Sequence, residues 1–125
     1  MRTKPTVLVI DDDPGVGALI REQLDRSYQV ETSSDGLAGY SDTVRLQPAV
    51  VILDLRMPVV DGLTVLRKLR SNPLTASTPV IVLGAAIDEV ARADHETLRI
   101  SAVLQKPVSH DVLSRAVATA AGKQA

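Results

Sequence analysis

The chain contains no cysteine, phenylalanine or tryptophan. Without cysteine it can form neither a disulfide framework nor a metal site with thiolate ligands. Tyr28 and Tyr40 are its two aromatic residues, so we expect aliphatic side chains to fill the core. The first residues also lack the long apolar stretch of a signal peptide or membrane span, from which we expect a cytoplasmic protein that does not enter a membrane.

The chain also lacks an excess of charge of either sign. Fourteen Lys and Arg residues stand against fifteen Asp and Glu residues, and no dense basic run occurs. We therefore expect no direct binding of nucleic acid by this chain. Its 125 residues, 45% of them hydrophobic, predict one globular domain with a sizeable core.

Short apolar runs alternate with amphipathic stretches in five strand-helix pairs. The predicted strands are residues 7–10, 28–32, 49–54, 80–83 and 102–104, and the predicted helices begin at Pro14, Asp35, Gly62, Asp88 and after the N-cap Ser109. The fourth of these helices covers residues 88–99. Continuous apolar runs without alternation are typical of strands covered on both faces, as in parallel sheets flanked by helices. The pattern therefore predicts the α/β fold class.

Carboxylates end two of the apolar runs. Asp54 follows residues 50–53, and the triplet from Asp11 through Asp12 to Asp13 follows residues 7–10. Because the carboxyl ends of strands form the binding crevice in such folds, we expect the four carboxylates to share one pocket. Their mutual repulsion would be costly without a cation, and a hard divalent ion such as Mg²⁺ fits best.

Three groups of residues together resemble the receiver domain of two-component response regulators. They are Asp11-Asp12, the run Asp54-Leu55-Arg56-Met57-Pro58 with Asp61-Gly62, and Lys106-Pro107. The resemblance covers nearly the whole chain, with residues 1–121 as the domain and 122–125 as a C-terminal tail. It implies a flavodoxin-like, doubly wound (βα)5 three-layer sandwich with parallel strand order 2-1-3-4-5, whose site lies where that order reverses.

The resemblance also implies a role for each of these residues. Asp54 would accept a phosphoryl group from the phosphohistidine of a sensor histidine kinase or phosphotransfer protein. Asp11 and Asp12 would hold Mg²⁺ together with Asp54 and the main-chain carbonyl of Arg56, and Lys106 would pair with the phosphoryl oxygens. The chain would be a signalling phosphoacceptor and not an enzyme in the ordinary sense. Its effector is unknown, and a homodimer through helix 4, strand 5 and helix 5 is one expectation.

General phosphoryl chemistry supports the same assignment. The transfer needs an in-line nucleophile and cationic groups that offset charge on the equatorial oxygens, and a carboxylate, Mg²⁺ and a lysine provide these parts. Mg²⁺ binds few protein carboxylates and retains several waters, which suits two or three aspartates and a carbonyl.

Two positions depart from the family pattern. Receivers usually carry Thr or Ser at the end of the fourth strand, where this chain has Gly84, and Tyr or Phe where it has Val103. The main-chain N–H groups of Gly84 and Ala85 would then be the remaining phosphoryl contacts. A hydrogen bond to a charged group contributes roughly 1.5–3 kcal/mol, so we expect weaker coupling between phosphorylation and surface rearrangement.

Other interpretations remain open from the sequence. The chain can be a pseudo-receiver that acts as a protein-interaction module without phosphorylation. It can also be a hydrolase with an aspartyl-phosphate intermediate, although Arg56 occupies the position of the second Asp in such enzymes. The acidic triplet can also stabilise the N-terminus of a helix. His95 and His110 are expected on the surface, and Ile20 in place of a third glycine argues against a dinucleotide loop at residues 15–17.

Overall fold

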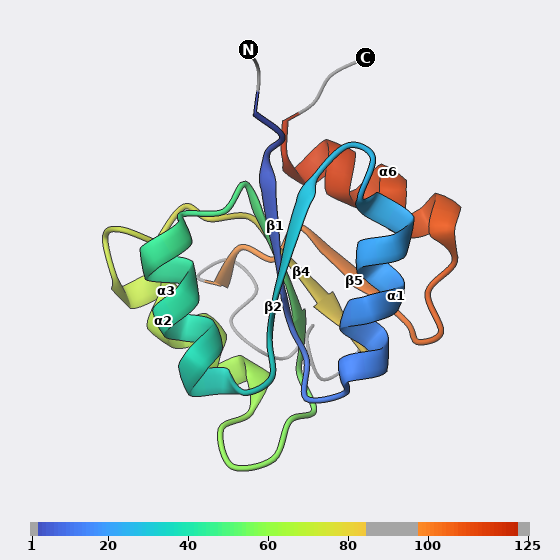
Figure 1. Ribbon diagram of the computed structural model, residues 1–125. Coiled ribbons are helices and arrows are strands. Elements are labelled where there is room, and N and C mark those ends of the chain that lie inside the picture. The colour runs from blue at the N-terminus through green and yellow to red at the C-terminus, as the bar shows by residue number, and fades with distance from the viewer. Residues whose placement is uncertain (1–2, 85–97, 123–125) are drawn as a thin grey trace.

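The computed structural model describes residues 3–84 and 98–122, and its centre is a parallel sheet with strand order β2-β1-β3-β4-β5 (Figure 1). The strands are β1 (Thr6–Ile10), β2 (Gln29–Ser33), β3 (Val50–Asp54), β4 (Val80–Leu83) and β5 (Ala102–Leu104). Every neighbouring pair of strands is parallel. The predicted fold class and strand order are therefore confirmed.

Four helices are seen among the described residues, namely α1 (Pro14–Leu24), α2 (Gly36–Leu46), α3 (Gly62–Ser71) and α6 (His110–Ala120). Each begins at a capping side chain that accepts a hydrogen bond from a main-chain N–H of the first turn, and the caps are Asp13, Asp35, Asp61 and Ser109. The predicted helix over residues 88–99 lies mostly outside the described residues. No helix in the described ranges is long and apolar enough to cross a membrane.

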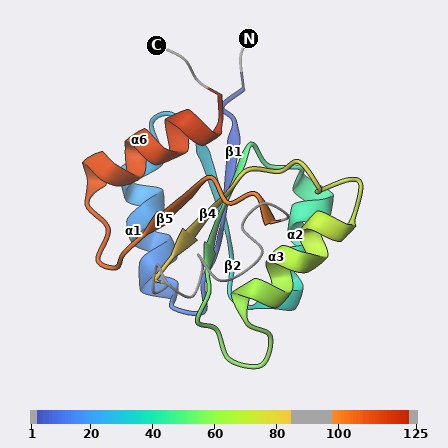
Figure 2. The same ribbon diagram turned by 180° about the vertical axis from the view of Figure 1, so that it is seen from behind.

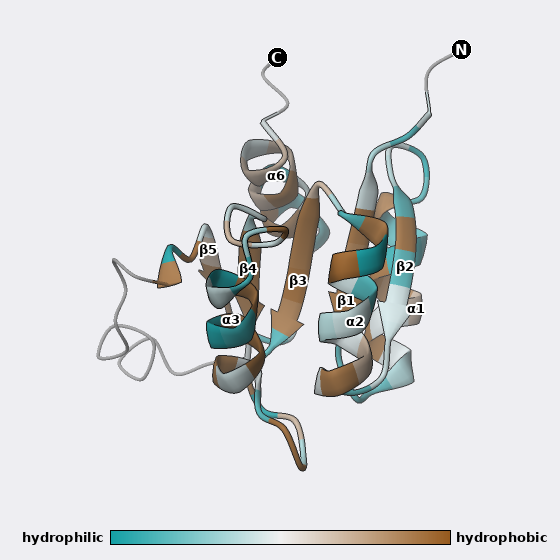
Figure 3. Ribbon diagram, turned by 90° about the vertical axis from the view of Figure 1, so that its left-hand side faces the viewer, coloured by the Kyte–Doolittle hydropathy of each residue, from teal (hydrophilic) through white to brown (hydrophobic). Residues whose placement is uncertain are grey.

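The helices cover both faces of the sheet. Helices α1 and α6 lie on one face and α2 and α3 on the other, as the front and rear views show (Figures 1 and 2). Each face has its own hydrophobic cluster, one around Ile20, Leu24 and Leu113 and one around Leu66 and Leu69. Aliphatic side chains dominate both clusters, as the scarcity of aromatic residues predicts. Strand β3 is coloured as hydrophobic along nearly its whole length (Figure 3).

The boundaries differ from the sequence prediction by one residue in three strands, and β1 begins at Thr6 and not at residue 7. Strand β2 begins at Gln29, because the main chain of Tyr28 still donates a hydrogen bond to Leu24 at the end of α1. The Tyr28 side chain is buried in the core next to α1. Strand β3 begins at Val50 and not at residue 49. Helix α2 ends at Leu46, and its C-cap Gln47, with a φ of +48°, closes the helix before the following proline.

Candidate metal centre

Three carboxylates meet where the strand order reverses. Strands β1 and β3 are neighbours with Ile10 paired to Leu53, so Asp11 and Asp54 leave the sheet side by side. Ligand oxygens of Asp11, Asp12 and Asp54 all lie within 4.8 Å of one another. Asp11 and Asp54 are buried, whereas Asp12 is exposed at the rim. The predicted convergence at the carboxyl edge of the sheet is therefore present for these three residues.

Asp13 was expected in the same pocket and lies elsewhere. Its side chain accepts a hydrogen bond from the N–H of Gly15 at 2.8 Å and so caps α1. The prediction that four carboxylates share one pocket is therefore wrong for Asp13. The alternative interpretation was that the acidic triplet stabilises the N-terminus of a helix. It applies to Asp13, whose side-chain oxygen caps α1.

Lys106 is the cation of this pocket. Its Nζ lies 3.0 Å from Asp11 Oδ2 and 3.5 Å from Asp54 Oδ2. Burial alone would lower the pKa of Lys106, but the carboxylates of Asp11 and Asp54 outweigh it and raise that pKa. The amine therefore stays charged, and it reaches across from the loop after β5 to the ends of β1 and β3.

The carboxyl group of Asp54 has an unfavourable environment for its charge. Burial raises its pKa, and the nearby charges of Asp11 and Asp12 act in the same direction. The main-chain N–H of Arg56, which donates to Asp54 Oδ1 at 2.9 Å, and the Lys106 ammonium oppose the shift without cancelling it. A further cation would favour the ionised form of this carboxyl.

The donor set fits a hard divalent cation. Asp11 Oδ2 is buried and makes no hydrogen bond of normal geometry among the described residues, although the Lys106 ammonium lies at ion-pair distance. The Lys106 ammonium offsets part of the cost of burying this carboxylate oxygen, and a bound cation would offset more of it. Oxygen ligands from two or three aspartates are what Mg²⁺ binds in proteins. The role of the Arg56 carbonyl as a further ligand stays a prediction.

Gly62 allows α3 to start directly beneath this pocket. A Cβ atom at this position would lie 2.5 Å from the main-chain oxygen of Asp54 and 2.6 Å from the Cα of Leu55, closer than real Cβ atoms approach. The N–H of Gly62 instead donates to the carbonyl of Leu55 at 3.1 Å. The loop that follows β3 is thereby tied back to the strand, which positions Asp54.

The main chain of Gly84 has an unusual conformation and already makes a hydrogen bond. Its φ is +71°, a conformation that side chains with a Cβ rarely adopt, and its N–H already donates to the Leu104 carbonyl at 2.9 Å. A Cβ here would lie 3.5 Å from Lys106 Cδ and 3.6 Å from Asp54 Oδ1, so space exists but the backbone would be strained. Phosphoryl contact through Gly84 remains a prediction, and Ala85 lies outside the described residues.

The second departure, Val103, is half-buried in β5 and packs against the cluster beneath α2 and α3. His110 is exposed at the start of α6, as predicted, and His95 lies outside the described residues.

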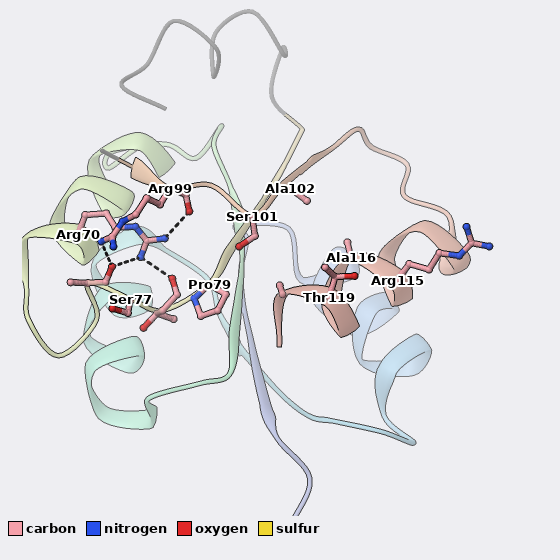
Figure 4. Close-up of a pocket in the computed structure, with 12 residues that line it drawn as sticks. Arg70, Ser77, Pro79, Arg99, Ser101, Ala102, Arg115, Ala116 and Thr119 are labelled. Carbon is pink, nitrogen blue, oxygen red and sulfur yellow. Dashed lines mark hydrogen bonds between the residues drawn. The ribbon is translucent and has the colours of Figure 1, made fainter. Parts of the chain in front are cut away.

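Two of the cavities formed by the described residues differ in their position relative to the acidic pocket. One, of about 320 Å³, is mostly apolar and runs between α1 and the loop after β5, from the exposed Leu19 to Lys106. The other, of about 620 Å³, lies at the amino ends of β4 and β5 and is lined by Arg70, Arg99 and Arg115 but by none of the acidic-pocket residues (Figure 4). Neither cavity could be predicted from the sequence, because each is formed by segments that are far apart along the chain.

Comparisons with known sequences agree with this geometry. The profile of the response regulator receiver domain matches residues 7–118. The DNA-binding dual master transcriptional regulator RpaA of Synechocystis is 43% identical over 82 residues, which cover 65% of this chain and 34% of that protein. The sensor histidine kinase TmoS of Ectopseudomonas mendocina is 34% identical over 113 residues, covering 90% of this chain and 12% of the kinase. The chain thus spans about a third or less of these curated relatives.

Solved structures show the same fold. The chemotaxis protein CheY4 of Vibrio cholerae has a TM-score of 0.85 at 23% identity, covering 94% of this chain and 99% of that chain. The receiver domain of a sensor histidine kinase from Pseudomonas aeruginosa PAO1 has a TM-score of 0.81 at 25% identity, covering 97% and 100%. Its structure is described with a magnesium ion coordinated in the active site cleft.

Proposed function

The chain belongs to the response regulator receiver domain family of two-component signalling, and on that premise we propose that Asp54 accepts a phosphoryl group in a Mg²⁺-dependent reaction. The observation that carries the proposal is the meeting of Asp11, Asp12 and Asp54 with the Lys106 ammonium. The proposed donor is a phosphohistidine of a sensor histidine kinase or phosphotransfer protein. Some relatives are themselves named as histidine kinases, which supports this choice of partner.

In the proposed reaction, a carboxylate oxygen of Asp54 attacks the phosphorus in line with the leaving imidazole nitrogen. The P–N bond of the donor breaks as the acyl phosphate P–O bond forms. Asp54 Oδ1 already accepts the Arg56 N–H, so Oδ2, which faces Lys106, is the oxygen we assign as the nucleophile. The Lys106 ammonium then exchanges its present carboxylate partners for a phosphoryl oxygen.

The proposed cofactor is Mg²⁺. The groups that would hold it are the side chains of Asp11, Asp12 and Asp54 and the main-chain carbonyl of Arg56. When bound, the ion supplies positive charge that offsets the charge of the phosphoryl oxygens. Asp11 positions the Lys106 amine in addition, since their ion pair is the shorter of the two that Lys106 makes.

The proposal is tested by incubation with acetyl phosphate, with and without Mg²⁺, and by measurement of the intact mass. We expect one phosphoryl group to be gained by the wild-type chain with Mg²⁺, and none by Asp54→Asn or without the ion. Mg²⁺ should also raise the melting temperature of the wild type and not that of Asp11→Asn, because a ligand that binds the folded state stabilises it.

A pseudo-receiver that works without phosphorylation is the second candidate. Gly84 and Val103 favour it, since a hydroxyl and an aromatic ring of the family pattern are absent at these positions. No gain of mass under conditions that label an ordinary receiver, together with measured Mg²⁺ binding, would select this candidate.

The remaining assignments rest on the phosphoacceptor role. Catalysis by the chain itself would be limited to self-phosphorylation and loss of the phosphoryl group. The proposed location is the cytoplasm, where ATP is available to phosphorylate the donor histidine. An effector protein, or a second copy bound through residues 88–99, β5 and α6, would receive the signal.

A further inference from the structure

The loop between β3 and α3 contains an unusual valine. Val59 has a φ of +71°, and the N–H of Val60 donates to the carbonyl of Pro58 at 2.8 Å across it. This is a three-residue turn with positive φ at its centre, a form that is rare and strained. Valine is among the residues least suited to it, because branching at Cβ crowds the main chain.

The anchors on both sides of Val59 explain how the strained turn is maintained. Met57 is buried in the cluster beneath α2 and α3, and Val60 packs against the same cluster. Asp61 caps α3, and the N–H of Gly62 binds the Leu55 carbonyl. The short connection between these fixed points leaves the central residue little choice of conformation.

Among the described residues, the side chain of Val59 makes no packing contact that would offset the strain of its main chain. It is 100% exposed and therefore buries no apolar surface against the described part of the chain. Single exposed apolar residues are common, but glycine or asparagine would adopt this φ with less strain and no loss of packing. The fold therefore requires this main-chain conformation but not a valine in it, and an exposed residue that is poorly suited to its conformation points to a functional contact.

Val59 lies beside the path to the phosphoacceptor. The loop leaves the sheet directly after Asp54 and projects beyond the carboxyl ends of the strands, where its tip is hydrophobic (Figure 3). A protein that brings a phosphohistidine to Asp54 must approach this same edge. A small phosphodonor such as acetyl phosphate has no extended surface with which to cover the loop.

We propose that Val59 is a specificity-determining contact for the phosphodonor protein, which buries this side chain against an apolar patch next to its phosphohistidine. The inference rests on the proposed phosphoacceptor role of Asp54. According to this inference, the surface of the phosphodonor protein that contacts Val59 is apolar and lies beside the charged groups that take part in the reaction.

The test compares two donors on three variants. Val59→Asn relieves the strain and removes the apolar group, Val59→Leu keeps an apolar side chain, and Leu74→Asn is a matched control. Leu74 is 61% exposed in the segment between α3 and β4, at the opposite end of the sheet. The donors are acetyl phosphate and the radiolabelled, autophosphorylated histidine kinase that labels the wild type fastest within a purified panel.

We expect Val59→Asn to lower the rate of transfer from the kinase about tenfold, as for loss of one well-buried contact, and to leave labelling by acetyl phosphate unchanged. Its melting temperature should rise above that of the wild type. Val59→Leu and Leu74→Asn should transfer at nearly the wild-type rate.

Equal kinase transfer by Val59→Asn and the wild type would overturn the inference, as would a loss in Val59→Leu as large as in Val59→Asn. A wild-type chain that acetyl phosphate labels but no kinase labels would also count against it. Self-association that Val59→Asn abolishes would assign the residue to a second copy instead. Failure of acetyl phosphate to label the wild type would defeat the proposed function, which is a separate outcome.

Discussion

Asp54 is a carboxyl group whose ionisation the metal-free fold opposes. Burial and the charges of Asp11 and Asp12 raise its pKa above the usual value for an aspartate. A group with a raised pKa in the folded state contributes stability below its unfolded pKa and loses that contribution as the pH rises through the folded value. The metal-free protein is therefore expected to lose stability over this window, between acidic and neutral pH.

The substitution Asp54→Asn tests this linkage. In EDTA at neutral pH the variant should be more stable than the wild type, because a neutral amide replaces a carboxylate whose charge is unfavourable there. The advantage should disappear once the pH falls below the unfolded pKa of aspartate. Urea unfolding midpoints measured over this range check the expectation, and Mg²⁺ should reverse the order at neutral pH. A difference between the two proteins that stays constant with pH would contradict it.

At the scale of elements, Arg70 joins α3 to two segments that are distant in sequence. Its guanidinium donates to the carbonyls of Leu98 at 2.7 Å and Thr78 at 2.8 Å. It also donates to the carbonyls of Thr75, Ala76 and Arg99. Burial lowers the pKa of Arg70, and the Arg99 charge adds to that effect. The Arg70 side chain thus connects the segments that precede β4 and β5 to the C-terminal end of α3.

Replacement of Arg70 by methionine should lower the free energy of unfolding by about 2–4 kcal/mol, since several carbonyls lose a charged donor at once. Arg70→Lys should recover part of this loss, because one ammonium cannot reproduce the planar set of donors. Urea unfolding measures both variants. Labelling by acetyl phosphate should remain in each, because Arg70 lies at the opposite end of the sheet from Asp54. A change below about 0.5 kcal/mol would show that these hydrogen bonds contribute little.

At the scale of the whole molecule, two features limit how far a phosphoryl group on Asp54 would affect the rest of the fold. The Gly84 N–H is engaged with Leu104, and the aliphatic Val103 occupies the place of the family's aromatic residue. Both features favour a weak connection between the acidic pocket and the surface formed by β5 and α6.

Phosphorylation should therefore change amide chemical shifts near Asp54 and Lys106 and leave those around Val103 and α6 nearly unchanged. We expect a coupling below about 1 kcal/mol, at or under the low end of typical allosteric coupling. Two-dimensional NMR of the wild type with and without acetyl phosphate and Mg²⁺ measures this, with Asp54→Asn as the control. Large shifts throughout β5 and α6 would show that the chain switches by another route.

Much of this architecture was determined by the sequence itself. The predicted bounds of β4 and β5 and the predicted cap Ser109 agree with the structure, because apolar runs and capping side chains act over a few residues. The meeting of Asp11 and Asp54 followed from a simple rule, that parallel strands present their carboxyl ends at one edge. Local patterns of this kind can be recognised from the sequence alone.

Only the tertiary structure decided the features that depend on distant contacts. Asp13 turns from the pocket to cap α1, and Gly84 takes a positive φ while its N–H pairs with Leu104 across the sheet. Arg70 binds carbonyls almost thirty residues away, and Val59 is strained because buried anchors fix the chain on both sides of it. These conformations result from packing between segments that are far apart in the chain, and no local pattern of residues records that packing.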